Sequence, residues 1–145
     1  IKGLDLKMEA GMPVSNKLSF QLAGTYTWQK AVDITDPVKK NYKHQIPYTP
    51  EHSGTASLTA ETPWINVGYM LTAVGNRYAL PQNIRENRID GYIEQGISAN
   101  RTFKLGKASL RLQGEIINLG DINYEVIKYY PMPGRSFRVS LKINY

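Results

Sequence analysis

A strict alternation of apolar and polar residues recurs along most of the chain, and it limits the possible folds more than any other feature. Successive side chains of a β-strand point to opposite faces, so a period of two indicates strands with one apolar face. Helical periodicity is hard to find, so the sequence predicts an all-β protein. The clearest run closes the chain, and its apolar members are Phe137, Val139, Leu141, Ile143 and Tyr145.

Six further segments show the same alternation, which predicts about seven strands in total. Each covers about ten residues, whereas strands of soluble proteins usually have about five or six. The additional segments are 3–10, 18–28, 53–61, 65–73, 91–100 and 108–116.

The predicted connections alternate between short and long. Met12–Asn16, Thr62–Pro63 and Thr102–Gly106 carry the Pro, Gly or Asn residues of tight turns. Long polar loops cover 29–51, 75–89 and 119–135. We therefore expect an antiparallel up-and-down meander with turns at one end and loops at the other, as in part of a large transmembrane β-barrel.

The alternation alone does not tell whether the apolar face meets lipid or forms a soluble core. Tyr26 and Trp28 fall at the loop end of their strand, and Trp64 and Tyr145 fall at turn ends. Two aromatic girdles at the membrane interfaces would have this arrangement. The alternative is that these are ordinary aromatic residues at strand ends.

Composition excludes several classes of protein. The 145 residues contain no cysteine, which excludes disulfide scaffolds and cysteine-based metal or redox sites. The net charge of +6 comes from scattered Lys and Arg, so we expect no nucleic-acid partner. The chain starts at Ile1 without an initiator Met or a signal segment, and we expect it to be a fragment or a processed product.

Several motifs in order resemble TonB-dependent outer-membrane receptors. The C-terminal part of that family has an Asn-Leu, then a Tyr-Glu, then Pro-Gly-Arg before the last strand. Here these motifs lie in the stretches Ile117–Glu125 and Tyr130–Phe137. Gly3–Leu6 and Ile46–His52 are similar to two further motifs of the family. Gly134 after Pro133 suits a sharp return into the strand, with Arg135 near the barrel mouth.

The resemblance implies a plugged barrel of about 22 strands. Residues 1–145 would form the C-terminal portion of this barrel, with the plug and the remaining strands absent. The receptor would lie in the outer membrane of a Gram-negative bacterium, in contact with its lipid. It would import an iron–siderophore, haem or vitamin B12, energised by the TonB complex through a TonB box in the missing N-terminal part. It would be no enzyme and would need no cofactor. The final strand, Phe137 to Tyr145, resembles the signal read by the barrel-assembly machinery.

Candidate ligand contacts lie in the predicted loops. His44 and His52 are the only histidines, and we find no spacing that predicts a metal or catalytic site. Aromatic and basic loop residues could bind a large anionic metal chelate or a vitamin by stacking and charge, although solvated loops with interface tyrosines are the commoner case. The candidates are Tyr42, His44, Arg77, Tyr78, Tyr129 and Tyr130.

A rival function from another class is a soluble lipid-binding or adhesive β-barrel module. In that case the apolar face would form a packed or ligand-filled interior, and the alternation of short turns and long loops would be a coincidence. Size-exclusion chromatography with and without detergent would separate the two hypotheses.

Overall fold

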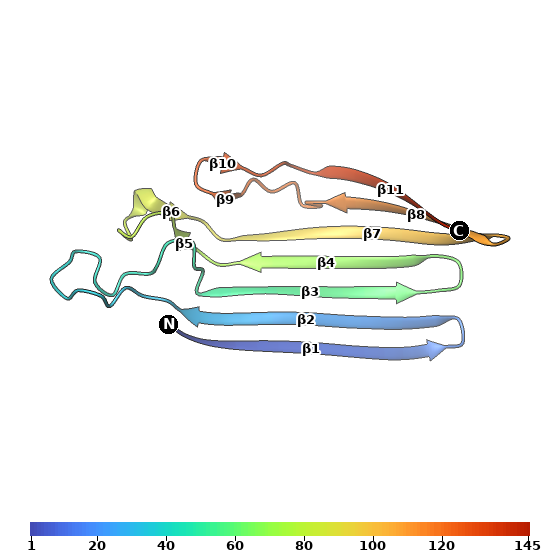
Figure 1. Ribbon diagram of the computed structural model, residues 1–145, viewed down its shortest axis with the longest axis horizontal. Coiled ribbons are helices and arrows are strands. Elements are labelled where there is room, and N and C mark those ends of the chain that lie inside the picture. The colour runs from blue at the N-terminus through green and yellow to red at the C-terminus, as the bar shows by residue number, and fades with distance from the viewer.

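A computed structural model describes residues 1–145, and its main feature is one antiparallel sheet of seven strands in up-and-down order (Figure 1). This confirms the predicted all-β meander. The strands are β1 (Lys2–Ser15), β2 (Leu18–Lys30), β3 (His52–Glu61), β4 (Asn66–Val74), β7 (Tyr92–Leu105), β8 (Ala108–Ile117) and β11 (Ser136–Asn144). No helix in the structure is long and apolar enough to cross a membrane.

Two of the long loops contain short hairpins, which the sequence pattern did not predict. The second loop holds β5 (Arg77–Tyr78) and β6 (Arg88–Ile89), with a 3-10 turn at Arg85–Asn87. The third loop holds β9 (Glu125–Ile127) and β10 (Tyr130–Pro131). Pairs this short give almost no alternation to detect.

The three long loops lie together at one end of the sheet and the three tight turns at the other (Figure 1). Two of the predicted turns were placed wrongly. Residues 12–15 belong to β1 and residues 102–105 belong to β7, so the real turns are Asn16–Lys17 and Gly106–Lys107. Pro13 is tolerated because the pairing with β2 is irregular between Pro13 and Ser15, as at a β-bulge.

Strand register aligns the apolar positions across the whole sheet. A one-residue slip at any strand pair would move its apolar residues to the other face, so this alignment defines one apolar face and one polar face. One row of paired positions crosses all seven strands and consists of Ala10, Leu22, Leu58, Tyr69, Ile97, Ile116 and Phe137.

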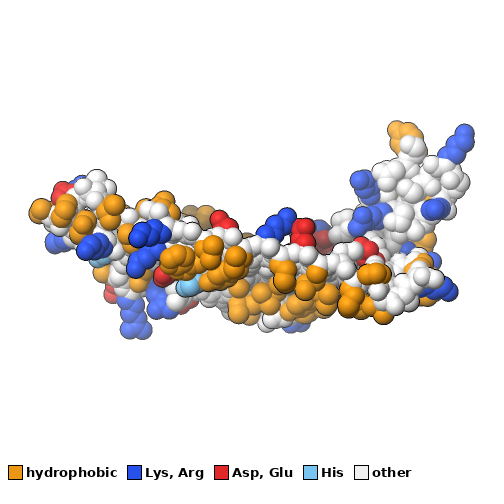
Figure 2. All heavy atoms as spheres, turned by 90° about the horizontal axis from the view of Figure 1, so that it is seen from below, with side chains coloured by type: hydrophobic (Ala, Val, Ile, Leu, Met, Phe, Trp, Pro, Cys, Tyr) orange, Lys and Arg blue, Asp and Glu red, His pale blue; other side chains and the backbone are white.

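Neither face of the sheet is covered by the chain. Only four residues are buried, and all lie in or next to the loops: Ala31, Arg77, Ile89 and Asn118. By contrast, Leu58 on central strand β3 keeps 44% of its surface exposed. Figure 2 shows hydrophobic side chains gathered along one side of the sheet. The apolar face therefore needs a covering from outside this chain.

The polar face is held by cross-strand hydrogen bonds and ion pairs. The Thr25 and Thr55 hydroxyls lie 2.8 Å apart, and Thr27 donates to Asp5 at 2.6 Å. Arg138 on β11 lies 3.2 Å from Glu115 on β8. These pairs agree with a polar, solvated wall.

Candidate functional site at the loop end of the sheet

The exit of β8 is fixed by Asn118, one of the most buried residues of the chain at 1% exposure. Its amide nitrogen donates to the carbonyl oxygens of Ile122 at 2.9 Å and Pro133 at 3.3 Å. The Ile122 N–H donates to the Asn118 side-chain oxygen at 2.9 Å. The backbone of Asn118 has a φ of 53°, which Asn tolerates better than most residues. Asn118 thus joins the start and the end of the third loop.

A second contact brings the chain back into β11. The Arg135 N–H donates to the Asp121 carboxylate at 2.7 Å, and Arg135 Nε donates to the Leu119 carbonyl at 3.1 Å. A Cβ on Gly134 would lie 2.7 Å from the same Asp121 oxygen. Gly134 therefore leaves room for this carboxylate, and no left-handed turn calls for glycine here. The Pro-Gly-Arg motif therefore has a structural role at the loop end of the sheet.

Arg77 joins the second loop to the third. It is 4% exposed, and one terminal nitrogen donates to the carbonyl oxygens of Glu125 at 2.8 Å and Val126 at 2.9 Å. Its guanidinium lies 5.8 Å from the ring centre of Tyr92. Its other terminal nitrogen is buried without a hydrogen-bond partner. The cation is held between a π-face and two backbone carbonyls.

Tyr92, which contacts Arg77, also belongs to an aromatic pair on the polar face. Its ring stacks on Tyr124 with 4.1 Å between the centroids, and the Tyr124 hydroxyl donates to the Glu94 carboxylate. Burial and then the adjacent Glu94 carboxylate raise the pKa of the Tyr124 hydroxyl far above its usual value. The third loop thus folds toward the polar face near the mouth.

The first and second loops meet at Asn83. Its side-chain oxygen accepts from the Gln45 N–H at 2.5 Å, and its side-chain nitrogen donates to the Gln45 carbonyl at 3.1 Å. His44 adds a contact, since its Nδ1 lies 3.2 Å from the Pro81 carbonyl. No recognisable motif surrounds Asn83, so the sequence did not predict that it joins the two loops.

The six predicted ligand residues do not form one cluster. Tyr42 and His44 are half-buried in the first loop, Arg77 is buried, and Tyr78 is half-buried on β5. Tyr129 and Tyr130 project from the β9–β10 hairpin with exposures of 77% and 70%. Tyr129 also lies against Lys128, whose ammonium group is 5.4 Å from its ring centre. Ligand binding by the six residues stays a prediction.

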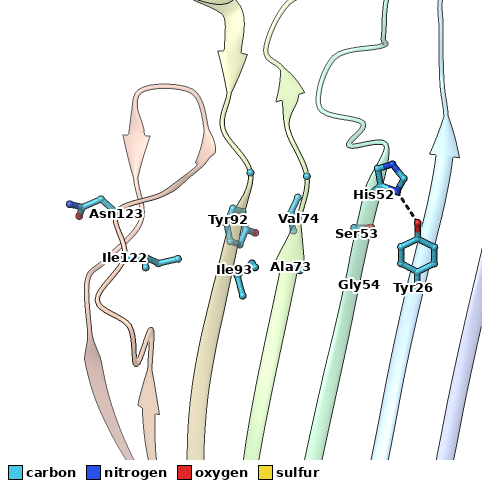
Figure 3. A pocket seen from close by; sticks show the side chains of 12 residues that line it. Tyr26, His52, Ser53, Gly54, Ala73, Val74, Tyr92, Ile93, Ile122 and Asn123 are labelled. Carbon is cyan, nitrogen blue, oxygen red and sulfur yellow. Dashed lines mark hydrogen bonds between the residues drawn. The ribbon is translucent and has the colours of Figure 1, made fainter.

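A shallow cavity of about 720 Å³ lies across the loop ends of β2, β3, β4 and β7 (Figure 3). Tyr26, Gly54, Ala73 and Ile93 line it, and all four belong to the apolar rows. The Tyr26 hydroxyl and His52 Nδ1 lie 2.8 Å apart at its edge. Ser53, Tyr92 and Asn123 also line it, so the lining is partly apolar and partly polar.

The predicted girdle residues lie at the two ends of the sheet. Trp28 pairs with Leu4 and with His52 at the loop end, and Tyr26 occupies the next apolar row. Trp64 lies in the turn between β3 and β4, and Tyr145 follows the end of β11. Their contact with a membrane interface stays a prediction.

No group of three or more His, Cys, Asp or Glu residues is arranged to hold a metal ion. His44 and His52 are instead near the Pro81 carbonyl and the Tyr26 hydroxyl, respectively.

Comparison with known proteins identifies the family. Residues 1–119 match the family described as TonB dependent receptor-like, beta-barrel. No curated protein matches the chain. The family match covers β1 through β8, including every aligned apolar row up to the third loop. The chain therefore belongs to the β-barrel family of TonB-dependent receptors, which are outer-membrane transporters of Gram-negative bacteria.

Proposed function

We propose that this chain is the C-terminal portion of the barrel of a receptor that imports a scarce nutrient across the outer membrane. One observation carries the proposal: apolar rows align across seven strands and stay exposed, while all long loops gather at the opposite end from the tight turns. Lipid would cover the apolar face and the polar face would line the lumen.

The open edges of the sheet agree with a larger barrel. Strands β1 and β11 each have only one neighbour in the sheet (Figure 1). Exposed long edges invite aggregation, and closure with further strands removes them. The remaining strands, a lumen-filling plug and a TonB box would belong to parts of the receptor outside this chain. The last strand would serve as the recognition signal for the barrel-assembly machinery.

The ligand we propose is an anionic metal chelate of the siderophore type, with haem and vitamin B12 as competing classes. Tyr129 and Tyr130 offer exposed rings at the mouth, and the Lys128 ammonium lies against one of them. Flat aromatic rings beside a cation can bind large, negatively charged conjugated ligands by stacking and charge.

An uptake experiment tests the function. The intact receptor is supplied to a strain that lacks it. Growth is then measured with ferric siderophores or haem as the sole source of iron, and with cobalamin as the sole source of vitamin B12. We expect growth on one ferric siderophore that is lost when TonB is deleted. Uptake that continues without TonB, or growth on none of the three classes, would contradict the proposal.

A variant experiment tests the ligand contact. The double change Tyr129→Ala and Tyr130→Ala should weaken binding of the transported ligand by about tenfold or more, because two stacking surfaces are lost. Val38→Ala is the control, since Val38 is an exposed residue of the first loop. Equal binding by the two variants would exclude the β9–β10 hairpin as a contact.

A further inference from the structure

The charges on the apolar face are all positive and all lie near its ends. Among the paired apolar rows, the only charged residues of the Asp, Glu, Lys and Arg types are Lys2, Lys30 and Arg101. Lys2 and Lys30 pair at the loop end. Arg101 lies on β7 toward the turn end and pairs with Leu112 on β8. An apolar face without a single carboxylate offers these cations no partner within the sheet.

The side chain of Arg101 turns toward the tight turns. Its guanidinium carbon lies 4.9 Å from the ring centre of Phe103, which is two residues nearer the turn. Arg101 is exposed and takes no part in the three ion pairs of the chain. A long cationic side chain that leaves an apolar surface in this direction carries its charge toward the membrane interface.

A second cation lies against an aromatic ring at the same end. The Lys17 ammonium is 6.0 Å from the Trp64 ring, which lies in the turn between β3 and β4. At the turn end, the β4–β7 pairing stops at Asn66 and Asn100. Arg101 is therefore level with the last residue of the turn that leads into β4. β7 and β8 continue beyond this level to Leu105, but both cations lie toward the turn end of the sheet, where lipid phosphates would lie.

From this geometry we infer that Arg101 binds the phosphate of an anionic phospholipid in the leaflet at the turn end of the barrel. The inference rests on the membrane placement in the proposed function, but not on the identity of the transported ligand. A planar guanidinium can donate two parallel hydrogen bonds to a phosphate. The acyl chains of the same lipid would lie on Leu112 and the neighbouring apolar rows.

The surroundings favour a lipid over a free phosphate ion. Phe103 and Leu112 flank Arg101 and offer nothing to an inorganic anion, whereas they would contact the acyl chains of a lipid. A charged group on a lipid-facing strand is unfavourable unless it reaches the headgroup region. A bound phosphate provides the counter-charge that no acidic residue of this face supplies.

Native mass spectrometry of the intact receptor tests this binding. The protein is released from bilayers that contain a minor fraction of phosphatidylglycerol in phosphatidylcholine, and retained lipids are counted. We expect wild-type protein to be enriched in phosphatidylglycerol and Arg101→Gln to lose about threefold or more of that enrichment, because the bidentate contact is gone. Arg101→Lys keeps the charge but loses the bidentate geometry, so its enrichment should lie between those of wild-type protein and Arg101→Gln.

Arg111→Gln is the matched control, because Arg111 lies one row away but on the polar face. Each variant must show the heat-dependent gel mobility of a folded barrel. Equal enrichment in wild-type protein and Arg101→Gln would overturn the inference, as would an equal loss in Arg111→Gln. Displacement of the lipid by excess inorganic phosphate would show a simple anion site and would also overturn it. A wild-type protein that does not enter bilayers would instead contradict the proposed function.

Discussion

Asn118 and Ile122 are joined by two reciprocal hydrogen bonds, each 2.9 Å long, between the amide side chain of Asn118 and the backbone of Ile122. The same amide reaches the Pro133 carbonyl, so one buried side chain fixes both ends of the third loop. Asn118 is the first residue of the Asn-Leu motif by which the sequence resembles its family. In the structure this residue holds the two ends of the third loop together.

Asn118→Ala should lower the free energy of unfolding by about 2–4 kcal/mol, since it leaves buried backbone groups without partners. The left-handed backbone at this position adds to the cost. Thermal unfolding in detergent micelles measures the change. Asn123→Ala, at an exposed position of the same loop, should behave as wild type. If both variants unfold alike, Asn118 is not the residue that fixes the loop.

Gly134→Ala should destabilise the entry of β11 by about 1–2 kcal/mol, because its new methyl group displaces the Asp121 carboxylate from the Arg135 N–H. In a double-mutant cycle, Gly134→Ala should cost much less once Asp121 is replaced by Ala. Gly114→Ala is the control, since a Cβ there meets nothing within 4 Å. Additive effects of the two changes would contradict this explanation.

Tyr124 should resist ionisation in alkaline solution. Because its pKa is raised in the folded state, the neutral hydroxyl is favoured by folding. Its contribution to stability is fully present below the ordinary tyrosine pKa of about 10 and is lost as pH rises through the raised pKa. Absorbance titration of tyrosinate in the folded protein, compared with Tyr124→Phe, measures this. Tyr124→Phe should lack one tyrosine that ionises only at high pH. If the two proteins titrate identically at high pH, the raised pKa does not belong to Tyr124.

Asn83→Ala should free the first loop from the second. Loss of the side-chain contacts to Gln45 should raise hydrogen exchange at the Gln45 amide by about three- to tenfold, as expected for one net hydrogen bond. Asn87→Ala is the matched control, because its side chain bonds only to Gln82 within the second loop. No change at Gln45 in Asn83→Ala would show that other contacts hold the loops together.

Much of the sheet could be predicted from the sequence, because the period of two persists over long strands and fixes which residues share a face. The pattern missed the strand ends near Pro13 and Thr102, where turn-forming residues continue inside paired strands. It also missed Asn83 and the hydrogen bond from Tyr124 to Glu94, because the partners of both residues lie far away in the chain. Such contacts depend on how the loops fold, and alternation carries no information about them.

The central claim is that the apolar face of the sheet meets lipid and the polar face meets water. The chain has no cysteine of its own, so single spin labels can be placed one at a time at Ala56, Ser57, Leu58 and Thr59 on β3 of the intact receptor. Electron paramagnetic resonance in bilayers then measures collisions with oxygen, which concentrates in lipid, and with a water-soluble nickel chelate. We predict oxygen contact at Ala56 and Leu58 and chelate contact at Ser57 and Thr59. Labels at Ala56 and Leu58 that are shielded from both reagents would indicate a packed interior and contradict the account.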